Sequence, residues 1–239
     1  MFVWGRDLRT FEGIARPPTP PVRPSYGQLP GCCVVAAARR YLIQMTKKNK
    51  SNKRQIILEE AAKLFKARGF SGASMRELGA QVGMEAASMY NHISSKDEIL
   101  DHICFYVSGT YISQLTEIEQ TSESYVEKIK ALIRLHIRLM VEEGAAVSVA
   151  NNDWKYLVEP RLTEFKEARK AYEKGFAALI ERGMEAGELQ PVNVSVALFT
   201  ILSAVRWVEL WYRPGRGITA EELEQNIMTI LLNGLEKKP

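Results

Sequence analysis

The stretch SMRELGAQVGMEAASMYNH, residues 74–92, decides the fold class of this chain. Ser74 and Glu77 form a capping box, in which the serine side chain accepts from the backbone N–H of Glu77 and the glutamate reaches back to Ser74. The short helix opened by this box should end before Gly83, which permits a tight turn. A second short helix, about 85–92, follows at once. Two short helices joined by a glycine-containing turn predict a helix-turn-helix.

An amphipathic helix precedes this motif and a long helix follows it. Gly69 ends the first helix, as a glycine after the last turn commonly does. Ser95 and Glu98 form a second capping box, which opens the long helix. The apolar face of the first helix has i, i+4, i+7 and i+8 spacing and consists of Ile57, Ala61, Leu64 and Phe65.

The remainder of the chain is also predicted to be helical. Strand-like alternation is absent after Asn52, and proline is rare there. Asn193 can cap one of the later helices, and Thr219 with Glu222 forms a third capping box. Because turn chemistry and periodicity agree, we expect an all-α fold. The later helices should run roughly 123–142, 145–157, 160–187, 194–212 and 220–235.

Composition and charge leave several classes of protein open. Hydrophobic residues make up 46% and charged residues 25% of the 239 residues, which is ordinary for a globular protein. The net charge of +4 is too small to establish nucleic-acid binding by itself. A basic arm without any acid is either a phosphate-binding tail or a solvated one, and it contains Arg39, Arg40, Lys47, Lys48, Lys50, Lys53 and Arg54.

The residues that enzymes and metal sites require are not arranged for either. There is no Gly-x-Ser-x-Gly elbow, no glycine-rich phosphate loop and no His-Glu-x-x-His pair, so we expect neither an enzyme nor a cofactor. The scattered cysteines and histidines predict no metal site and fit a reducing cytoplasm. No apolar run reaches about 18 residues, so we expect no membrane span.

Residues 1–44 differ from the rest of the chain. Six prolines gather there, and no helical period is visible. We expect a disordered extension, since such a segment buries little apolar surface. The sequence that begins at Met45 resembles a natural start, which would place the extension upstream of it.

The second short helix has the outward face that a recognition helix needs. Small and polar side chains permit close approach to base edges, while Met89 can anchor the helix inward. An ordinary three-helix cluster with a polar outer face fits the same pattern. The pattern alone therefore favours DNA binding without excluding a structural role.

The segment from about Lys53 to Tyr111 resembles the DNA-binding domain of the TetR family of transcriptional regulators. The matching runs are residues 57–65, 68–70, 74–79, 82–84, 88–93 and 95–100. The resemblance covers about a quarter of the chain. It implies an N-terminal three-helix helix-turn-helix DNA-binding domain at 52–112 and a C-terminal helical ligand-binding and dimerisation domain at 113–239. It also implies a homodimeric repressor of a near-palindromic operator.

The same resemblance assigns the DNA contacts. Backbone contacts fall to Ser74, Tyr90 and His92, with Lys96 beside them, and base contacts to Ala86, Ala87, Ser88 and Asn91. Arg54 and Arg76 complete the predicted DNA-binding residues. The chain departs from the family pattern at Glu85, where serine or threonine usually opens the recognition helix. No arginine is available there to read guanine, so DNA shape should contribute to specificity.

Aromatic and basic residues of the C-terminal region suggest an effector site. The run 206–215 is similar to TetR-type regulators of fatty-acid and acyl-CoA metabolism, and the similarity implies an acyl-CoA or another long apolar effector. Plain core or dimer contacts are the alternative for each aromatic residue. The predicted ligand-binding residues are Trp154, Arg161, Tyr172, Phe176, Arg206, Trp207 and Trp211.

The last two helices should form the homodimer contact. Their apolar surface exceeds the need of one helix pair, and the resemblance implies a four-helix bundle across a two-fold axis. The apolar residues are Leu198, Ile201, Leu202, Val205, Val208, Ile227, Ile230, Leu231 and Leu235. A helical lipid-binding or interaction protein that does not bind DNA remains the second hypothesis.

Overall fold

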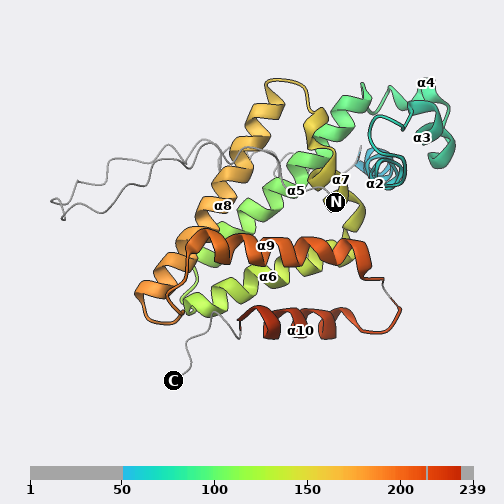
Figure 1. Ribbon diagram of the computed structural model, residues 1–239. Coiled ribbons are helices and arrows are strands. Elements are labelled where there is room, and N and C mark those ends of the chain that lie inside the picture. Colours follow the sequence, from blue (N-terminus) through green and yellow to red (C-terminus); the bar gives the residue numbers. More distant parts are fainter. Residues whose placement is uncertain (1–50, 214, 233–239) are drawn as a thin grey trace. The chain divides into compact units, whose positions relative to one another are not determined.

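The computed structural model describes residues 51–213 and 215–232, and its regular elements there are all helices (Figure 1). The all-α prediction is confirmed. Residues 1–50 lie outside the described part, and so do the predicted extension at 1–44 and most of the basic arm. The helices are α2 (Ser51–Arg68), α3 (Met75–Val82), α4 (Ala86–Met89), α5 (Lys96–Glu119), α6 (Tyr125–Glu142), α7 (Gly144–Asn152), the short 3₁₀ helix η2 (Trp154–Tyr156), α8 (Arg161–Glu185), α9 (Val194–Trp211) and α10 (Ala220–Leu232).

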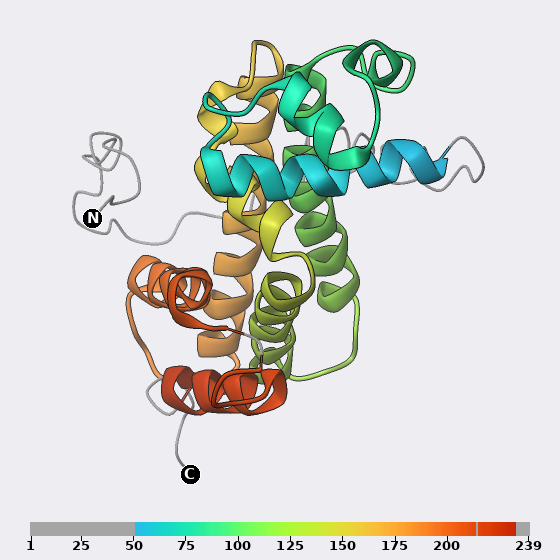
Figure 2. The same cartoon turned by 90° about the vertical axis from the view of Figure 1, so that its right-hand side faces the viewer.

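Helix α5 runs between the helix-turn-helix region and the C-terminal helices. It packs against α2 near its start and against α6, α7 and α8 along its length. Helices α2, α3 and α4 gather at one end of α5, while α9 and α10 lie near its other end beside α6 (Figures 1 and 2). The boundary predicted at residue 112 falls inside α5, so one continuous helix joins the two predicted domains.

Two of the three predicted capping boxes form completely. The Ser74 hydroxyl accepts from the Glu77 N–H at 3.2 Å, and the Glu77 carboxylate accepts from the Ser74 N–H at 3.0 Å. Thr219 and Glu222 exchange the same two hydrogen bonds at the start of α10. At α5, Ser95 caps the helix, but the Glu98 carboxylate accepts from the N–H and hydroxyl of Ser94 instead.

The second helix of the helix-turn-helix is shorter than predicted. Regular helix spans only four residues of the predicted 85–92, because Glu85 at the N-cap makes no side-chain hydrogen bond that would stabilise the first turn. Residues 90–92 continue as a turn, in which the His92 N–H donates to the Met89 carbonyl at 2.9 Å. Residues 86–92 therefore consist of one helical turn followed by a hydrogen-bonded turn.

The predicted stretch 145–157 is also divided. Helix α7 ends at Asn152, whose side-chain amide donates to the Ser148 carbonyl and competes with the helical hydrogen bonds. The 3₁₀ helix η2 then carries Trp154 through the turn. The end predicted for the last helix at 235 lies outside the described residues.

Helix α9 is the single helix among the described residues that is long and apolar enough to cross a membrane. Arg206 and Glu209 interrupt its apolar sequence, so the expectation that no membrane span is present stays a prediction. One such helix is weak evidence for a span. Its inner face packs into the core through Ala197, Leu198, Ile201, Val205 and Val208.

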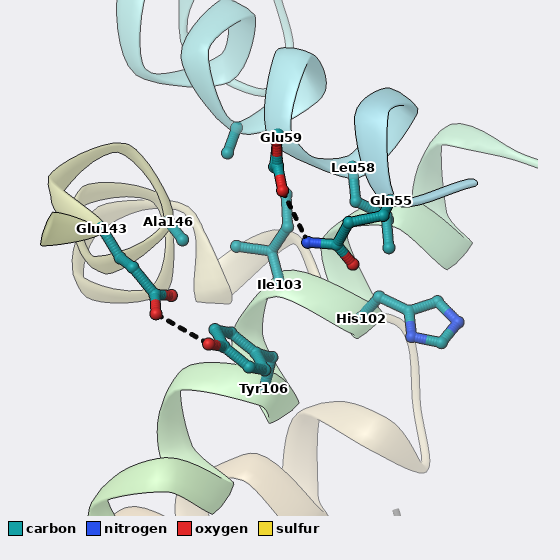
Figure 3. A pocket seen from close by; sticks show the side chains of 9 residues that line it. Gln55, Leu58, Glu59, His102, Ile103, Tyr106, Glu143 and Ala146 are labelled. Atoms are coloured by element: carbon teal, nitrogen blue, oxygen red, sulfur yellow. Dashed lines mark hydrogen bonds between the residues drawn. The ribbon is translucent and has the colours of Figure 1, made fainter. Parts of the chain in front are cut away.

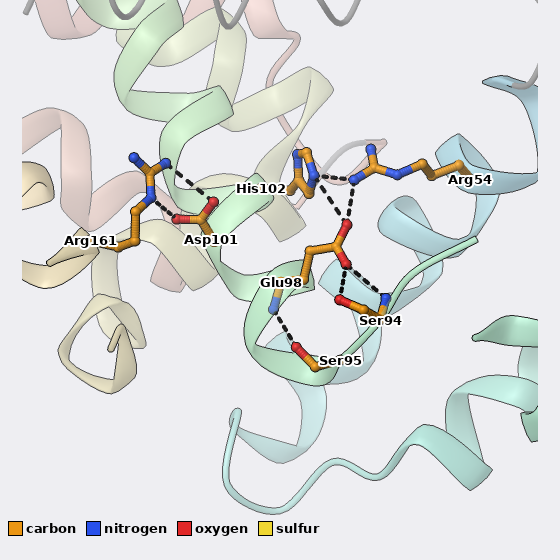
Figure 4. Close-up of polar contacts among 7 residues, drawn as sticks. All are labelled: Arg54, Ser94, Ser95, Glu98, Asp101, His102 and Arg161. Carbon is orange, nitrogen blue, oxygen red and sulfur yellow. Dashed lines mark hydrogen bonds and ion pairs between the residues drawn. The ribbon is translucent and has the colours of Figure 1, made fainter. Parts of the chain in front are cut away.

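The first turns of α5 are held to helices on two sides (Figure 4). On one side, Arg54 of α2 donates to the Glu98 carboxylate at 2.9 Å, and it also contacts the ring of His102. On the other, Arg161 of α8 makes a bidentate pair with Asp101, at 2.5 and 3.2 Å, and lies 3.5 Å from the centre of the Phe105 ring. Both pairs are about two-thirds shielded from solvent.

The Glu98 carboxyl is stabilised in its charged form. Partial burial alone would raise its pKa, but the hydrogen bonds from Ser94 and the pair with Arg54 outweigh burial and lower the pKa from 4.5 to about 2. Because the folded-state pKa lies below the unfolded one, this carboxylate stabilises the fold above about pH 4.5. That contribution is lost as the pH falls toward 2.

Glu98→Gln should therefore flatten the acid limb of the stability curve. At pH 7 the variant should be less stable, because the charge that Arg54 faces is gone. Between pH 4.5 and 2 its free energy of unfolding should fall less than that of the wild type. Urea unfolding at a series of pH values measures both quantities. Glu123→Gln, at an exposed carboxylate between α5 and α6, is the control, and equal acid losses in Glu98→Gln and wild type would refute the assignment.

Candidate DNA-binding and effector sites

Helix α4 and the turn after it present a polar outer surface. Met89 is fully buried and anchors the segment, together with Ile93 after the turn. The exposed side chains on the other side are Ala87, Ser88, Tyr90 and Asn91, with His92 half-buried. The predicted division between an inward anchor and an outward reading face is therefore present in the structure. The side chain of Ala86 lies outside the described part.

The two predicted contacts at the start of α3 are also on the surface. The Ser74 hydroxyl takes part in the capping box, donating to the Glu77 carboxylate at 2.9 Å. Hydrogen bonds from Ser74 lower the pKa of Glu77 and keep it charged. Arg76 lies one residue inside the helix and is exposed. The exposed Arg76 could face a phosphate directly, whereas the Ser74 hydroxyl is already engaged by Glu77.

Lys96 and Arg54 have structural partners that the sequence did not indicate. The Lys96 ammonium donates to the carbonyls of Phe70 and Ala73 at 2.9 and 3.0 Å and lies 4.4 Å from the centre of the Phe70 ring. Arg54 faces Glu98, as described above. Their phosphate contacts stay predictions, because each cation would have to share or give up these partners.

The predicted effector residues do not form one enclosed cavity in the described part. Trp207 and Trp211 share a face of α9, as their spacing requires, but both are more than half exposed. Spacing of i, i+4 places two residues on one face without saying which face is buried. Tyr172 and Phe176 are buried core residues, which agrees with the alternative that these aromatic residues pack in the core.

The other three predicted effector residues lie around the α7–α8 junction. Trp154 stacks on Phe165, with ring centres 6.2 Å apart. Arg206 of α9 donates to the carbonyl of Asn151 and to the side chain of Asn152. Arg161 is engaged by Asp101 and Glu164, so its guanidinium has a structural role that the sequence did not reveal.

Sequence reasoning named Tyr172 but missed the two polar neighbours with which it forms a largely buried cluster. His136 of α6 stacks on Tyr111 of α5 at 4.4 Å and is within 2.9 Å of the Tyr172 hydroxyl of α8. Burial lowers the pKa of His136 to about 3, so the ring is neutral. No motif signals such a cluster, because its three members are widely spaced in the sequence.

A pocket lies between α2, α5 and α7 (Figure 3). It is a partly open pocket, and the roughly 430 Å³ of empty space in it includes open solvent. None of the seven predicted effector residues lines it. Its walls are formed by Gln55, Leu58, Glu59 and Ala62 of α2, His102, Ile103 and Tyr106 of α5, and Glu143 and Ala146 at the start of α7.

Helices α3 and α4, preceded by α2, form a helix-turn-helix. Two family models match this chain. The model described as "Bacterial regulatory proteins, tetR family" matches residues 57–103, and the model described as "Tetracyclin repressor-like, C-terminal domain" matches residues 122–235. The chain belongs to the TetR family of transcriptional regulators.

The chain is similar to named transcriptional repressors over most of its length. The chain is similar to the HTH-type transcriptional repressor KstR2 of Mycobacterium tuberculosis, with 24% identity over 79% of this chain and 95% of the relative. It is similar to KstR2 of Rhodococcus jostii, with 26% identity over 78% of this chain and 92% of the relative.

Solved structures agree on the fold. The ketosteroid transcriptional regulator KstR2 of Mycobacterium tuberculosis superposes with a TM-score of 0.74 at 24% identity, over 78% of this chain and 96% of that one. AibR in complex with isovaleryl coenzyme A and operator DNA gives 0.66 at 26% identity, over 75% of this chain and 97% of that one.

Substitutions on the helix-turn-helix should separate two kinds of DNA contact. Arg76→Ala should weaken binding to all sequences alike and lower the log–log salt slope by about one, because one phosphate contact is lost. Ser88→Ala and Asn91→Ala should change base preference instead, since their side chains face outward from α4 and its turn. Fluorescence anisotropy with operator and mutated-operator DNA measures both effects. Arg138→Ala, at an exposed arginine of α6, should change neither. Unaltered affinity and preference in all three test variants would mean that the recognition segment is misplaced.

Proposed function

We propose that this protein is a ligand-responsive transcriptional repressor that binds a near-palindromic operator as a homodimer in the cytoplasm. An apolar effector, with an acyl-CoA as the favoured class, releases it from DNA. The observation that carries the proposal is the anchored helix-turn-helix joined by the unbroken helix α5 to the C-terminal helices. A TetR-family relative, AibR, is described in complex with both isovaleryl coenzyme A and operator DNA, which supports the effector class.

The homodimer proposal is supported by an exposed apolar face on α9 and α10. Several residues that were expected to form it are instead inside the protomer, including Leu198, Ile201, Val205 and Val208. Ile230 is on the surface as expected, with 76% of its area exposed. We define the α9–α10 face by its large exposed apolar side chains, namely Val196, Phe199, Trp207, Leu210, Trp211 and Ile230. An exposed patch of this kind marks an interaction site.

Leu210→Lys should convert the dimer to a monomer and weaken operator binding. The leucine is 59% exposed in the protomer, so the lysine costs little there, but it would bury a charge in a dimer. Sedimentation velocity at micromolar concentration measures the association state. Val158→Lys is the matched control, because Val158 is a similarly exposed apolar residue before α8. A wild-type protein that sediments as a monomer would refute the homodimer.

Release from DNA requires the effector to prefer one arrangement of the protein. A ligand shifts the equilibrium only by the difference between its affinities for the DNA-competent and DNA-incompetent arrangements. Helix α5 can transmit such a difference, because Arg54 and Arg161 hold its first turns to α2 and α8. A change around α8 would then move the support on which the DNA-binding helices rest.

Acyl-CoA thioesters should loosen the protein–operator complex. A coupling of about 1–3 kcal/mol corresponds to a 5- to 150-fold loss of operator affinity. The test titrates the complex with thioesters of increasing chain length, using DNA from upstream of the protein's own gene. Free coenzyme A is the control. If free coenzyme A acts as strongly as the thioesters, or if no thioester acts, the acyl-CoA assignment fails and another apolar effector should be sought.

A helical lipid-binding protein without DNA binding is the second candidate. It is favoured by Glu85, which is exposed at the start of α4 and would repel a phosphate. It predicts acyl-CoA binding with no shift of any upstream DNA fragment in a gel. Detection of a sequence-specific shift would remove this candidate.

A further inference from the structure

The pocket between α2, α5 and α7 lies outside the predicted effector site. Figure 3 shows that three helices line the pocket: Glu59 and Gln55 come from α2, Tyr106 from α5, and Glu143 from the start of α7. Its apolar surface comes from Leu58, Ala62, Ile103 and Ala146. It therefore combines an apolar wall with charged groups that come from different helices.

Two carboxylates of this pocket are oriented by neutral donors. The Tyr106 hydroxyl donates to Glu143 at 2.7 Å, and the Gln55 amide donates to Glu59 at 2.9 Å. Burial and the nearby carboxylates raise the pKa of Tyr106, so the phenol remains a neutral donor. Each hydrogen bond uses one oxygen and leaves the negative charge of the group in place.

Neither carboxylate has an ion-pair partner within residues 51–213 and 215–232. Three cations of α2 face groups outside the pocket. Arg54 pairs with Glu98, Lys63 pairs with Glu60, and Lys66 faces Glu209 and the Gly144 carbonyl.

His102 adds no compensating charge to the pocket. Burial, and then the neighbouring Arg54, lower its pKa, so the imidazole is neutral at physiological pH. The lining thus carries two negative charges beside an apolar wall. A cation that enters would meet both carboxylates and the aromatic ring of Tyr106, and carboxylates and aromatic faces both attract ammonium groups.

We propose that this pocket binds a small organic cation with an apolar body, such as a primary alkylamine. The ammonium group would lie between Glu59 and Glu143, and the carbon chain would lie against Ile103 and Ala146. Anions and long acyl chains are unsuited to the site, the first because of its charge and the second because of its size. This site goes beyond the proposed function, since it needs neither operator DNA nor an acyl-CoA.

The test is calorimetric titration of the full chain, without DNA, with n-propylamine through n-hexylamine at pH 7.5. The matching n-alcohols have the same apolar bodies without the charge. Amines should bind saturably, and each added methylene should tighten binding by about fourfold until the pocket is filled. The alcohols should bind at least tenfold more weakly.

Variants locate the binding. Glu59→Gln and Glu143→Gln keep acceptors for Gln55 and Tyr106 but remove the charges, so each should weaken amine binding and the double variant should reduce it to the level of the alcohols. Ala146→Leu should block binding by filling the pocket without changing its charge. Glu167→Gln, at an exposed carboxylate of α8, is the control and should bind like wild type.

Three results would overturn the proposal. Alcohols that bind as tightly as amines would show an apolar pocket without cation selectivity. Amine binding that survives both the double variant and Ala146→Leu would place it elsewhere, and wild-type protein that binds no amine would exclude the site. The comparison of amines with alcohols uses wild-type protein, so it remains decisive even if a variant fails to fold. Failure of the DNA or acyl-CoA experiments would leave this result unaffected.

Discussion

The ion pairs at the first turns of α5 are the constraint on which the arrangement of this protein depends. Glu98 and Asp101 lie one turn apart, and they face arginines from α2 and α8. Arg161 adds a fork-shaped double hydrogen bond and a contact with the Phe105 ring, a geometry that lysine could not reproduce. The start of α5 therefore cannot shift relative to either neighbour without breaking a partly shielded charge pair.

The same end of α5 also helps to hold the proposed recognition segment in place. The recognition segment has little helix of its own, and its position depends on Met89 and on packing against α3. Lys96 fixes the loop before α3 by bonding two of its carbonyls. The proposed DNA-reading surface on α3 and α4 is thus held by the loop before α3 and by α5, and regular helix contributes little to it.

Sequence reasoning succeeded where local chemistry determines structure. Capping boxes at Ser74 and Thr219, the turn at Gly83 and the periodicity of the long helices all act within a few residues, so the helix order was predictable. It also predicted Met89 as an anchor. The length of α4 was overestimated, because Glu85 supplies no cap and periodicity alone does not reveal that loss.

Predictions about distant contacts were less successful. Trp207 and Trp211 were rightly placed on one face of α9, but burial of the opposite face depends on α6, α8 and α10. Arg161, Lys96 and Arg54 were judged by charge, but each has at least one partner that lies 23 or more residues away in the sequence. The pocket between α2, α5 and α7 was also not predicted, because its lining comes from three separate segments.

The proposed function requires this chain to read a specific DNA sequence as a two-fold symmetric regulator. Selection of bound fragments from a random DNA library with the purified full chain, followed by sequencing, tests this most directly. One near-palindromic motif should be enriched, with half-site centres separated by about 34–36 Å or a multiple of that spacing. No enriched motif at low salt, under conditions in which the protein is folded, would contradict it.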